Sequence, residues 1–190
     1  VAVSLKKKKV EERQEYEVNI YDTISTCENL TCSNKSTHET KYEKRFAQAK
    51  IKVDKETLSK SWRCGTTVCD FIRANLRIKI DAYEERVSEI VKVDTQPLAD
   101  RLHGDQNIVK LFYEEHSKYG CYSQNWGASK GQDHYMDVCV VLNAKAWKQY
   151  QDGKLHEAVP QTRNRLYVAF SRARGSVYIA SDKLFKSYKS

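Results

Sequence analysis

Apolar and polar positions follow two different periods from residue 51 to the end of the chain. Short apolar runs, of the length of strands, alternate with segments whose apolar residues recur every three or four positions, as in helices. The clearest run is 137–142, which is continuously apolar after Asp137 and predicts a strand buried on both faces. Residues 89–93 and 177–180 predict two more strands. The alternation predicts an α/β domain with a mainly parallel sheet flanked by helices.

Four segments have features of an amphipathic helix, lying at about residues 66–76, 97–102, 107–115 and 166–174. The first begins at Thr66, which we expect to be its N-cap. The last precedes Gly175, a natural stop at the C-terminal end of a helix. Arg172 is therefore expected on this last helix, outside its apolar stripe.

The first fifty residues have a different composition. Residues 6–17 are almost all charged or amide side chains, and residues 24–45 are rich in Ser, Thr, Asn and Lys. Neither stretch can anchor a core. We therefore predict a charged and polar N-terminal arm or loop over 1–50 and one folded domain over 51–190. Only two prolines and seven glycines occur, which argues against a long flexible linker and against an all-β sandwich.

Charge and cysteine content narrow the class of partner. Lys and Arg outnumber Asp and Glu by 33 to 25, and this net charge of +8 suits a polyanion such as nucleic acid, although solubility explains it equally well. No apolar run reaches the roughly 18 residues of a membrane span, so we expect a soluble, cytoplasmic chain with no membrane partner. The six cysteines form no C-x-x-C pair, so we expect reduced thiols and no bound metal.

Three short segments carry candidate chemistry. Lys130 and Gly131, between a polar stretch and the buried strand, can bring an ammonium and an open backbone to phosphates. Arg172 can project a planar cation toward a phosphate and neutralise charge that develops during phosphoryl transfer. Arg63 precedes the start of a predicted helix, where the helix dipole favours anions, so an anion near both would resolve the conflict.

Each segment also has a plainer explanation. Lys130 and Gly131 could be a turn beside a solvated lysine, Arg172 a cation near the C-terminal end of a helix, and Arg63 a surface arginine at a loop end. The pattern G-x-x-x-x-G-K-[ST], which cradles the β and γ phosphates of ATP, occurs nowhere in these 190 residues.

Taken in order, the three segments resemble the C-terminal motifs of UvrD-like (superfamily 1) DNA helicases. Residues 61–64, Ser-Trp-Arg-Cys, resemble motif IV, and residues 127–131 followed by the strand at 138–141 resemble motif V. Residues 166–174, Leu-Tyr-Val-Ala-Phe-Ser-Arg-Ala-Arg, resemble motif VI, the most specific of the three. The resemblance covers about residues 51–182 and implies the second RecA-like lobe of such a motor. The usual K-G-L-E-F becomes Lys-Gly-Gln-Asp-His at 130–134.

The resemblance also implies residue roles. Arg63 and Arg172 would act catalytically by contacting the γ-phosphate of ATP, and Asp133 would approach the ribose. The nucleotide-binding set is Lys130, Gly131, Asp133 and Arg172, and the set contacting single-stranded DNA is Trp126, Ser129 and Lys130. ATP and Mg²⁺ would be held only in the complete motor, whose first lobe, with the Walker A motif, belongs to the same longer chain or to a partner chain. The lobe would not be catalytic without it.

A second hypothesis is a non-catalytic module that kept the fold of the lobe for contacts with nucleic acid or protein. The altered motif V and the missing motif for phosphate binding favour it. A third class, an independent nuclease or transferase, would need paired carboxylates or a nucleophile with a base, and the sequence offers no convincing set.

Overall fold

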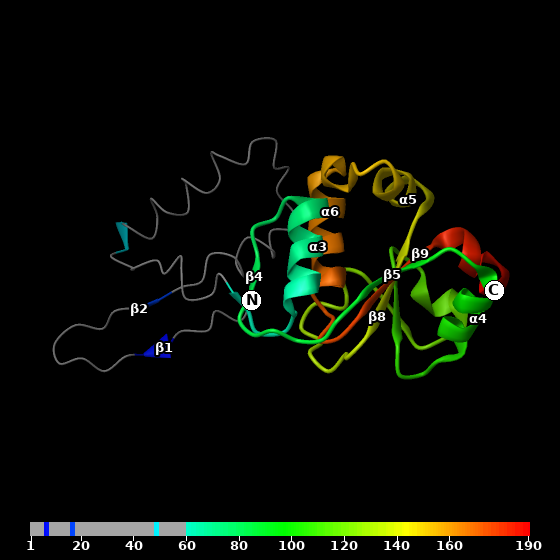
Figure 1. The fold of residues 1–190 in the computed structure, drawn as a ribbon, viewed down its shortest axis with the longest axis horizontal. Helices are drawn as coiled ribbons and strands as arrows, with labels where there is room; N and C mark the ends of the chain where they lie inside the picture. Colours follow the sequence, from blue (N-terminus) through cyan, green and yellow to red (C-terminus); the bar gives the residue numbers. More distant parts are fainter. Residues whose placement is uncertain (1–5, 8–15, 18–47, 50–59) are drawn as a thin grey trace. The chain divides into compact units, whose positions relative to one another are not determined.

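The computed structural model describes residues 6–7, 16–17, 48–49 and 60–190 (Figure 1). The chain divides into two units, 1–59 and 60–190. In the first, β1 (Lys6–Lys7) and β2 (Tyr16–Glu17) pair antiparallel. The predicted boundary at 50/51 and the predicted polar loop at 24–45 lie outside the described residues, so both stay predictions.

A five-stranded sheet forms the centre of the second unit. Its strands are β5 (Ile90–Val93), β6 (Val109–Phe112), β7 (Ser123–Asn125), β8 (Val138–Leu142) and β9 (Val177–Ser181). Their order is β5-β9-β8-β6-β7, and every neighbouring pair is parallel. A separate parallel pair joins β3 (Lys60–Ser61) to β4 (Asp81–Ala82).

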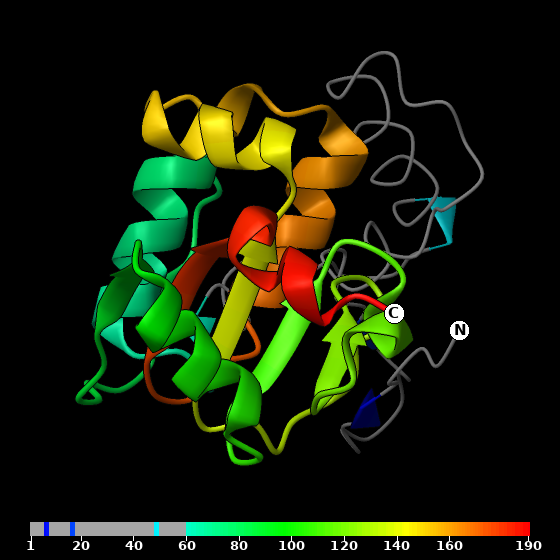
Figure 2. The same cartoon turned by 90° about the vertical axis from the view of Figure 1, so that its right-hand side faces the viewer.

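Helices cover both faces of the five-stranded sheet (Figures 1 and 2). The α-helices are α3 (Thr66–Leu76), α4 (Gln96–Gly104), α5 (Ala144–Gln151) and α6 (Pro160–Phe170). Short 3₁₀ helices are η1 (His116–Tyr119), η2 (Leu155–Glu157) and η3 (Asp182–Tyr188). Helices α3, α5 and α6 contribute to one core cluster, and α4 and η3 to the other. The predicted class, an α/β domain whose parallel sheet is flanked by helices, is confirmed. This is the architecture expected of a RecA-like lobe.

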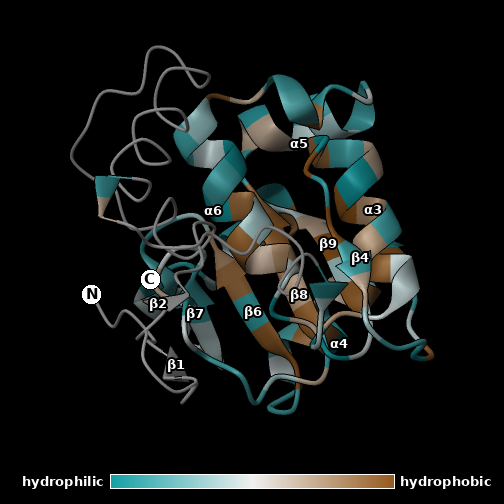
Figure 3. Ribbon diagram, turned by 90° about the vertical axis from the view of Figure 1, so that its left-hand side faces the viewer, coloured by the Kyte–Doolittle hydropathy of each residue, from teal (hydrophilic) through white to brown (hydrophobic). Residues whose placement is uncertain are grey.

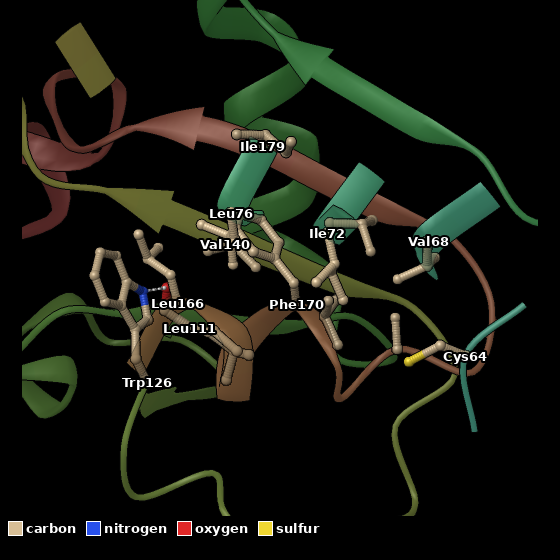
Figure 4. Close-up of a cluster of buried hydrophobic side chains, with 14 of the residues drawn as sticks. Cys64, Val68, Ile72, Leu76, Leu111, Trp126, Val140, Leu166, Phe170 and Ile179 are labelled. Carbon is tan, nitrogen blue, oxygen red and sulfur yellow. Dashed lines mark hydrogen bonds between the residues drawn. The ribbon is translucent and has the colours of Figure 1, made fainter. Parts of the chain in front are cut away.

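The buried strand β8 shows why the sheet is covered on both sides. All five of its residues are buried, and alternate residues face opposite cores. Val138 and Val140 pack toward α3 and α6, whereas Cys139 and Val141 pack toward α4 and η3. Figure 4 shows the first cluster, in which Phe170 of α6 lies among side chains of α3 and the sheet. The strands behind α3 and α6 are largely hydrophobic in Figure 3. Each such fully buried aliphatic side chain contributes about 1.5–3 kcal/mol.

The helix predicted over 107–115 is wrong, because this segment forms β6. Its alternation has period two: Val109 and Leu111 join one cluster and Phe112 the other. The strand was not predicted because Lys110 lies within it, and a lysine is seldom fully buried. Here its ammonium Nζ donates to the carbonyl oxygen of Asp105 at 2.6 Å, and its stem fills the second core.

The ends of two helices also differ from their predicted positions. Helix α3 has Gly65 rather than Thr66 as its N-cap residue. Helix α6 ends at Phe170, five positions before the expected stop at Gly175. Arg172 therefore lies in the turn after α6 rather than on the helix. In the described part of the chain, no helix combines the length and the apolar character that crossing a membrane requires.

Candidate functional site

Three arginines from two distant segments lie close together, and two of them share one carboxylate. Arg63 precedes α3, whereas Arg172 and Arg174 follow α6, and Asp133 lies in the loop before β8. These loops are adjacent because β8 and β9 are neighbours in the sheet and both begin there. The backbone N–H of Arg174 donates to the carbonyl of Met136 at 3.0 Å, which joins the turn after α6 to the loop before β8. The arrangement places an excess of positive charge at the amino ends of these strands.

The turn between α6 and β9 needs a glycine. A Cβ on Gly175 would collide with the carboxylate oxygen Oδ1 of Asp137, which also accepts a hydrogen bond from the N–H of Ser176 at 2.6 Å. The N–H of Gly175 donates to Met136 at 2.7 Å. Gly175 thus serves the turn that carries Arg172 and Arg174, rather than ending α6 directly.

Arg63 is held between Asp133 and the turn after α6. Its Nε lies 2.6 Å from Oδ1 of Asp133, and its Nη1 donates to the carbonyl of Ser171 at 3.0 Å. The hydrogen bond and charge of Arg63, with a smaller effect from Arg174, lower the pKa of the Asp133 carboxyl. The anion predicted near Arg63 is therefore a carboxylate of the chain itself.

Arg172 is fixed by backbone carbonyls. Its Nε donates to Val168 at 3.1 Å and its Nη1 to Gln132 at 3.2 Å. Burial lowers the pKa of Arg172, and repulsion from Arg63 lowers it further. Among the described residues, no ion pair is recorded between Arg172 and a carboxylate within 4.0 Å. A guanidinium oriented by neutral carbonyls keeps its full charge for an external anion.

Arg174 is a site residue that the sequence interpretation missed. Its Nη2 lies 3.3 Å from Oδ2 of Asp133, and its Nε is buried without a hydrogen-bond partner in the structure. Its position two residues after Arg172, in a turn with a glycine next to it, was the available signal. Three guanidinium groups and one carboxylate leave two positive charges uncompensated within this cluster of side chains.

The predicted phosphate loop lies beside this cluster. The bond from Arg172 to the carbonyl of Gln132 joins it to the segment that contains Lys130 and Gly131. Gly131 has φ of +85°, a conformation that glycine adopts far more readily than other residues. Lys130 and Gly131 are both exposed. The roles of Lys130, Gly131 and Asp133 in nucleotide binding stay predictions.

Trp126 and Ser129, which the sequence predicts to contact DNA, do not face solvent in the described chain, and their contact with DNA stays a prediction. The indole Nε1 of Trp126 donates to the carbonyl of Leu111 at 2.9 Å, and its ring lies in the core (Figure 4). The hydroxyl of Ser129 donates to the carbonyl of Trp126 at 2.7 Å. Both side chains are fully buried, so they pack beneath the loop and have no exposed surface that a nucleotide could contact.

An exposed aromatic pair lies next to Arg63 in the chain. Trp62 is 57% exposed and stacks on Tyr83, with ring centroids 3.4 Å apart and an angle of 22° between the planes. The carbonyl of Trp62 accepts a hydrogen bond from Arg86 at 3.1 Å. A rigid, solvent-facing indole beside a cationic cluster is a surface on which a planar base can stack. The sequence alone gave no sign that Trp62 is exposed and Trp126 buried.

The four cysteines in the described part of the chain are thiols. Cys64, Cys69, Cys121 and Cys139 are free, whereas Cys27 and Cys32 lie outside the described residues. The Sγ of Cys64 contacts the carbonyl of Ser171 at 3.4 Å, beside Arg63. A hydrogen bond from Cys69 and the charges of Arg63 and Arg172 lower the pKa of Cys64. Within the described part, His, Cys, Asp and Glu form no group that could hold a metal ion.

The shallow cavities lie elsewhere. One, of about 150 Å³, is lined at the carboxyl ends of the strands by residues that include Glu114, Glu115 and Asp182. A second, of about 240 Å³, lies under the first residues of α5 and α6. The arginine cluster is at the opposite, amino edge of the sheet and contributes no residue to either cavity.

Comparison with known proteins gives limited similarity. No protein-family model matches the chain, and no curated protein matches it. Among solved structures, the chain is similar to the crystal structure of PRRSV nsp10 (helicase), with 16% identity and a TM-score of 0.39 over 76% of this chain and 28% of that one. It is also similar to methylated PRRSV nsp10 (helicase), with 19% identity and a TM-score of 0.37 over 64% of this chain and 23% of that one. The chain thus spans about a quarter of the length of these helicases.

Proposed function

We propose that this chain supplies the second RecA-like lobe of a UvrD-like, ATP-dependent DNA helicase. In this role Arg63 and Arg172 contact the γ-phosphate of ATP. The observation that carries the proposal is their convergence: Arg63 donates to the carbonyl of Ser171, the residue before Arg172, and shares Asp133 with Arg174, at the amino edge of a parallel sheet.

The chemistry of the cluster suits a polyphosphate. Guanidinium groups bind phosphate oxygens through paired N–H donors, and a fixed cation stabilises the charge that develops during phosphoryl transfer. Arg172 is held by two backbone carbonyls, so little reorganisation is needed when the phosphate arrives. The two uncompensated charges favour a multiply charged anion over a single carboxylate.

The exposed indole of Trp62 provides a complementary feature for the nucleotide. It adjoins Arg63 in the chain, and its stack with Tyr83 fixes one ring face. The exposed remainder of the indole can receive a base while the neighbouring arginine contacts phosphate. Such a pairing of aromatic and cation distinguishes a nucleotide from inorganic phosphate.

The site is half of a nucleotide site. ATP and Mg²⁺ would be held mainly by a first lobe that carries the Walker A motif, since none occurs in these 190 residues. Mg²⁺ would there neutralise charge on the phosphate oxygens. This chain's own arginines would contact the γ-phosphate from the opposite side. Contact with single-stranded DNA would fall to the exposed loop of Lys130, because Trp126 and Ser129 are buried.

The proposal predicts the outcome of one substitution in the assembled motor. When the chain is joined to a Walker A lobe, single-stranded DNA should stimulate ATP hydrolysis, and Arg172→Ala should lower the stimulated rate by about 10²–10³-fold because it removes a fixed transition-state cation. The matched control is Arg101→Ala, which removes the same charge from an exposed position on α4, across the sheet.

Two results would count against this function. Normal hydrolysis by the Arg172→Ala variant would remove the assigned role. Binding of single strands that weakens steeply with salt, is unaffected by nucleotide and is accompanied by no hydrolysis would favour the alternative, a non-catalytic nucleic-acid-binding module.

A further inference from the structure

We propose that Asp133 is the resting counter-ion of the arginine cluster, and that the terminal phosphates of a nucleoside triphosphate displace it from Arg63 and Arg174. The inference rests on the proposed function and deepens it by adding a regulatory contact and a third phosphate ligand, Arg174. In the resting state Asp133 occupies the place that a phosphate oxygen takes in the loaded state.

The first argument is the geometry of the carboxylate. Its two oxygens are divided between two guanidinium groups: Oδ1 lies 2.6 Å from Nε of Arg63, and Oδ2 lies 3.3 Å from Nη2 of Arg174. A phosphate oxygen makes the same kind of charge-assisted contact with a guanidinium. Asp133 therefore bridges the cations as a bound anion does, and an external anion must compete with it for Arg63.

The second argument is that this carboxylate can leave at low cost. Its side chain is 58% exposed, so water solvates it again as soon as the bridge opens. An exposed ion pair contributes little to stability, because solvent screens the charges. By contrast, Arg172 is fixed by carbonyls of Val168 and Gln132 and does not depend on Asp133 for its position. Opening the bridge leaves the rest of the cluster in place.

The third argument is the charge that remains unmatched. One carboxylate opposes three guanidinium groups, so a multiply charged phosphate chain neutralises the cluster better than Asp133 does. Nε of Arg174 is buried without a partner, which leaves this residue able to reorient toward a stronger acceptor. The bridge thus selects against weakly charged anions, which cannot displace the carboxylate, and admits polyphosphates.

The test uses inorganic triphosphate as the probe, titrated calorimetrically into the full 190-residue chain and its variants near 0.15 M salt. Asp133→Asn keeps the size of the side chain and removes the competing charge, so triphosphate should bind roughly three- to tenfold tighter than to the original chain. The matched control is Asp94→Asn, which changes the net charge equally at an exposed position after β5. Screening should hold its effect below about twofold.

Two further variants separate this inference from the proposed function. Arg63→Ala should weaken triphosphate binding in both the original and the Asp133→Asn backgrounds, which reports the site itself. Arg174→Ala should weaken binding more in the Asp133→Asn background, where Arg174 is released to the ligand. Thermal unfolding of each variant checks that it remains folded.

The outcomes are distinct. If triphosphate binds with dependence on Arg63, but Asp133→Asn binds no tighter than Asp94→Asn, the counter-ion role is overturned while the phosphate site stands. Failure of both the original chain and Asp133→Asn to bind triphosphate through Arg63 would overturn the site and the counter-ion together. If triphosphate binds only to the Asp133→Asn variant, the carboxylate blocks the site in the original chain, and the inference is supported.

Discussion

At the scale of single residues, the arginines at this site are not interchangeable with lysines. Arg63 makes two separate contacts from one planar group, to the carboxylate of Asp133 and to the carbonyl of Ser171. Arg172 likewise reaches two carbonyls in different segments. A lysine ammonium has three donors, but its flexible stem does not hold them in the rigid planar fork that spans these two acceptors. The rigid fork of arginine is what joins the loops around the site.

Lys110 is a second residue whose charge needs explanation. It is fully buried on β6, where burial lowers its pKa, and the carbonyl of Asp105 is its acceptor. Replacing a buried charge by an apolar side chain of similar length is often stabilising, because the charge no longer has to leave water. We expect Lys110→Met to raise the free energy of unfolding by about 1 kcal/mol, measured by urea denaturation.

Lys110→Ala provides the contrast, since it leaves a cavity and should lower the free energy of unfolding by about 2–3 kcal/mol. A loss of more than about 1 kcal/mol in the methionine variant would show that the bond to Asp105 outweighs the cost of desolvation.

The order of motif-like segments predicts one site for Arg63 and Arg172, and Arg63 indeed contacts Ser171, the residue before Arg172. Sequence reasoning could not place Trp126 and Trp62 correctly. Trp126 stands among polar residues in the sequence but is buried, whereas Trp62 stands beside Arg63 and is exposed. Burial of a residue in a loop depends on which distant segment covers it, and local pattern does not record that.

At the scale of elements, the bounds of the strongly periodic strands and helices were predicted to within a few residues. Strand β8 and helix α3 have apolar patterns that packing confirms. Strand β7 was missed because its three residues are polar and lie at the edge of the sheet, paired only with β6. Helix α5 was missed because only Ala146 is fully buried, although Asn143, whose side chain accepts from the N–H of Ala146 at 2.9 Å, is a typical N-cap.

The C-terminal element is tied to η1 by charge. Both Lys118 and Lys189 lie 2.7 Å from the carboxylate of Glu115, one on each oxygen, and these bonds lower the pKa of Glu115 to about 2. The folded pKa is below the usual value of about 4.3, so the ionised carboxylate stabilises the fold above that value. The contribution is lost as the pH falls toward about 2.

Glu115→Gln should therefore lower the melting temperature slightly at neutral pH, by roughly 1–3 °C, because the pairs are exposed. The difference from the original chain should shrink below about pH 5 and vanish only below about pH 2, where the carboxyl is protonated and, like the amide, neutral. Melting curves recorded across this pH range check it. An equal deficit at pH 2 and pH 7 would show that charge is not the cause.

At the scale of the whole molecule, the two edges of the parallel sheet in the described domain carry different features. The amino ends of β8 and β9 carry the arginine cluster, and the carboxyl ends carry the cavity lined by Glu114, Glu115 and Asp182. Cations pair with two of these carboxylates, Lys118 and Lys189 with Glu115 and Arg165 with Glu114, so the excess of positive charge lies at the amino edge. That edge suits a phosphate.

The architecture of this domain was largely predictable, because alternating strands and helices leave few arrangements other than a parallel sheet between two helical layers. Only some of the residues that form the site were predictable. Asp133 was expected at a ribose and is found bridging Arg63 and Arg174. That difference comes from one ion pair between loops, which has no signature in spacing or periodicity.

The affinity of the 190-residue chain for ATP, compared with ADP, tests the central claim most directly. If the arginine cluster binds the terminal phosphate, ATP should bind about tenfold more tightly than ADP, and Arg172→Ala should remove most of that preference. Arg101→Ala should leave it unchanged. Equal affinity for ATP and ADP in the original chain, or an undiminished preference in Arg172→Ala, would contradict the assignment of this cluster to the γ-phosphate.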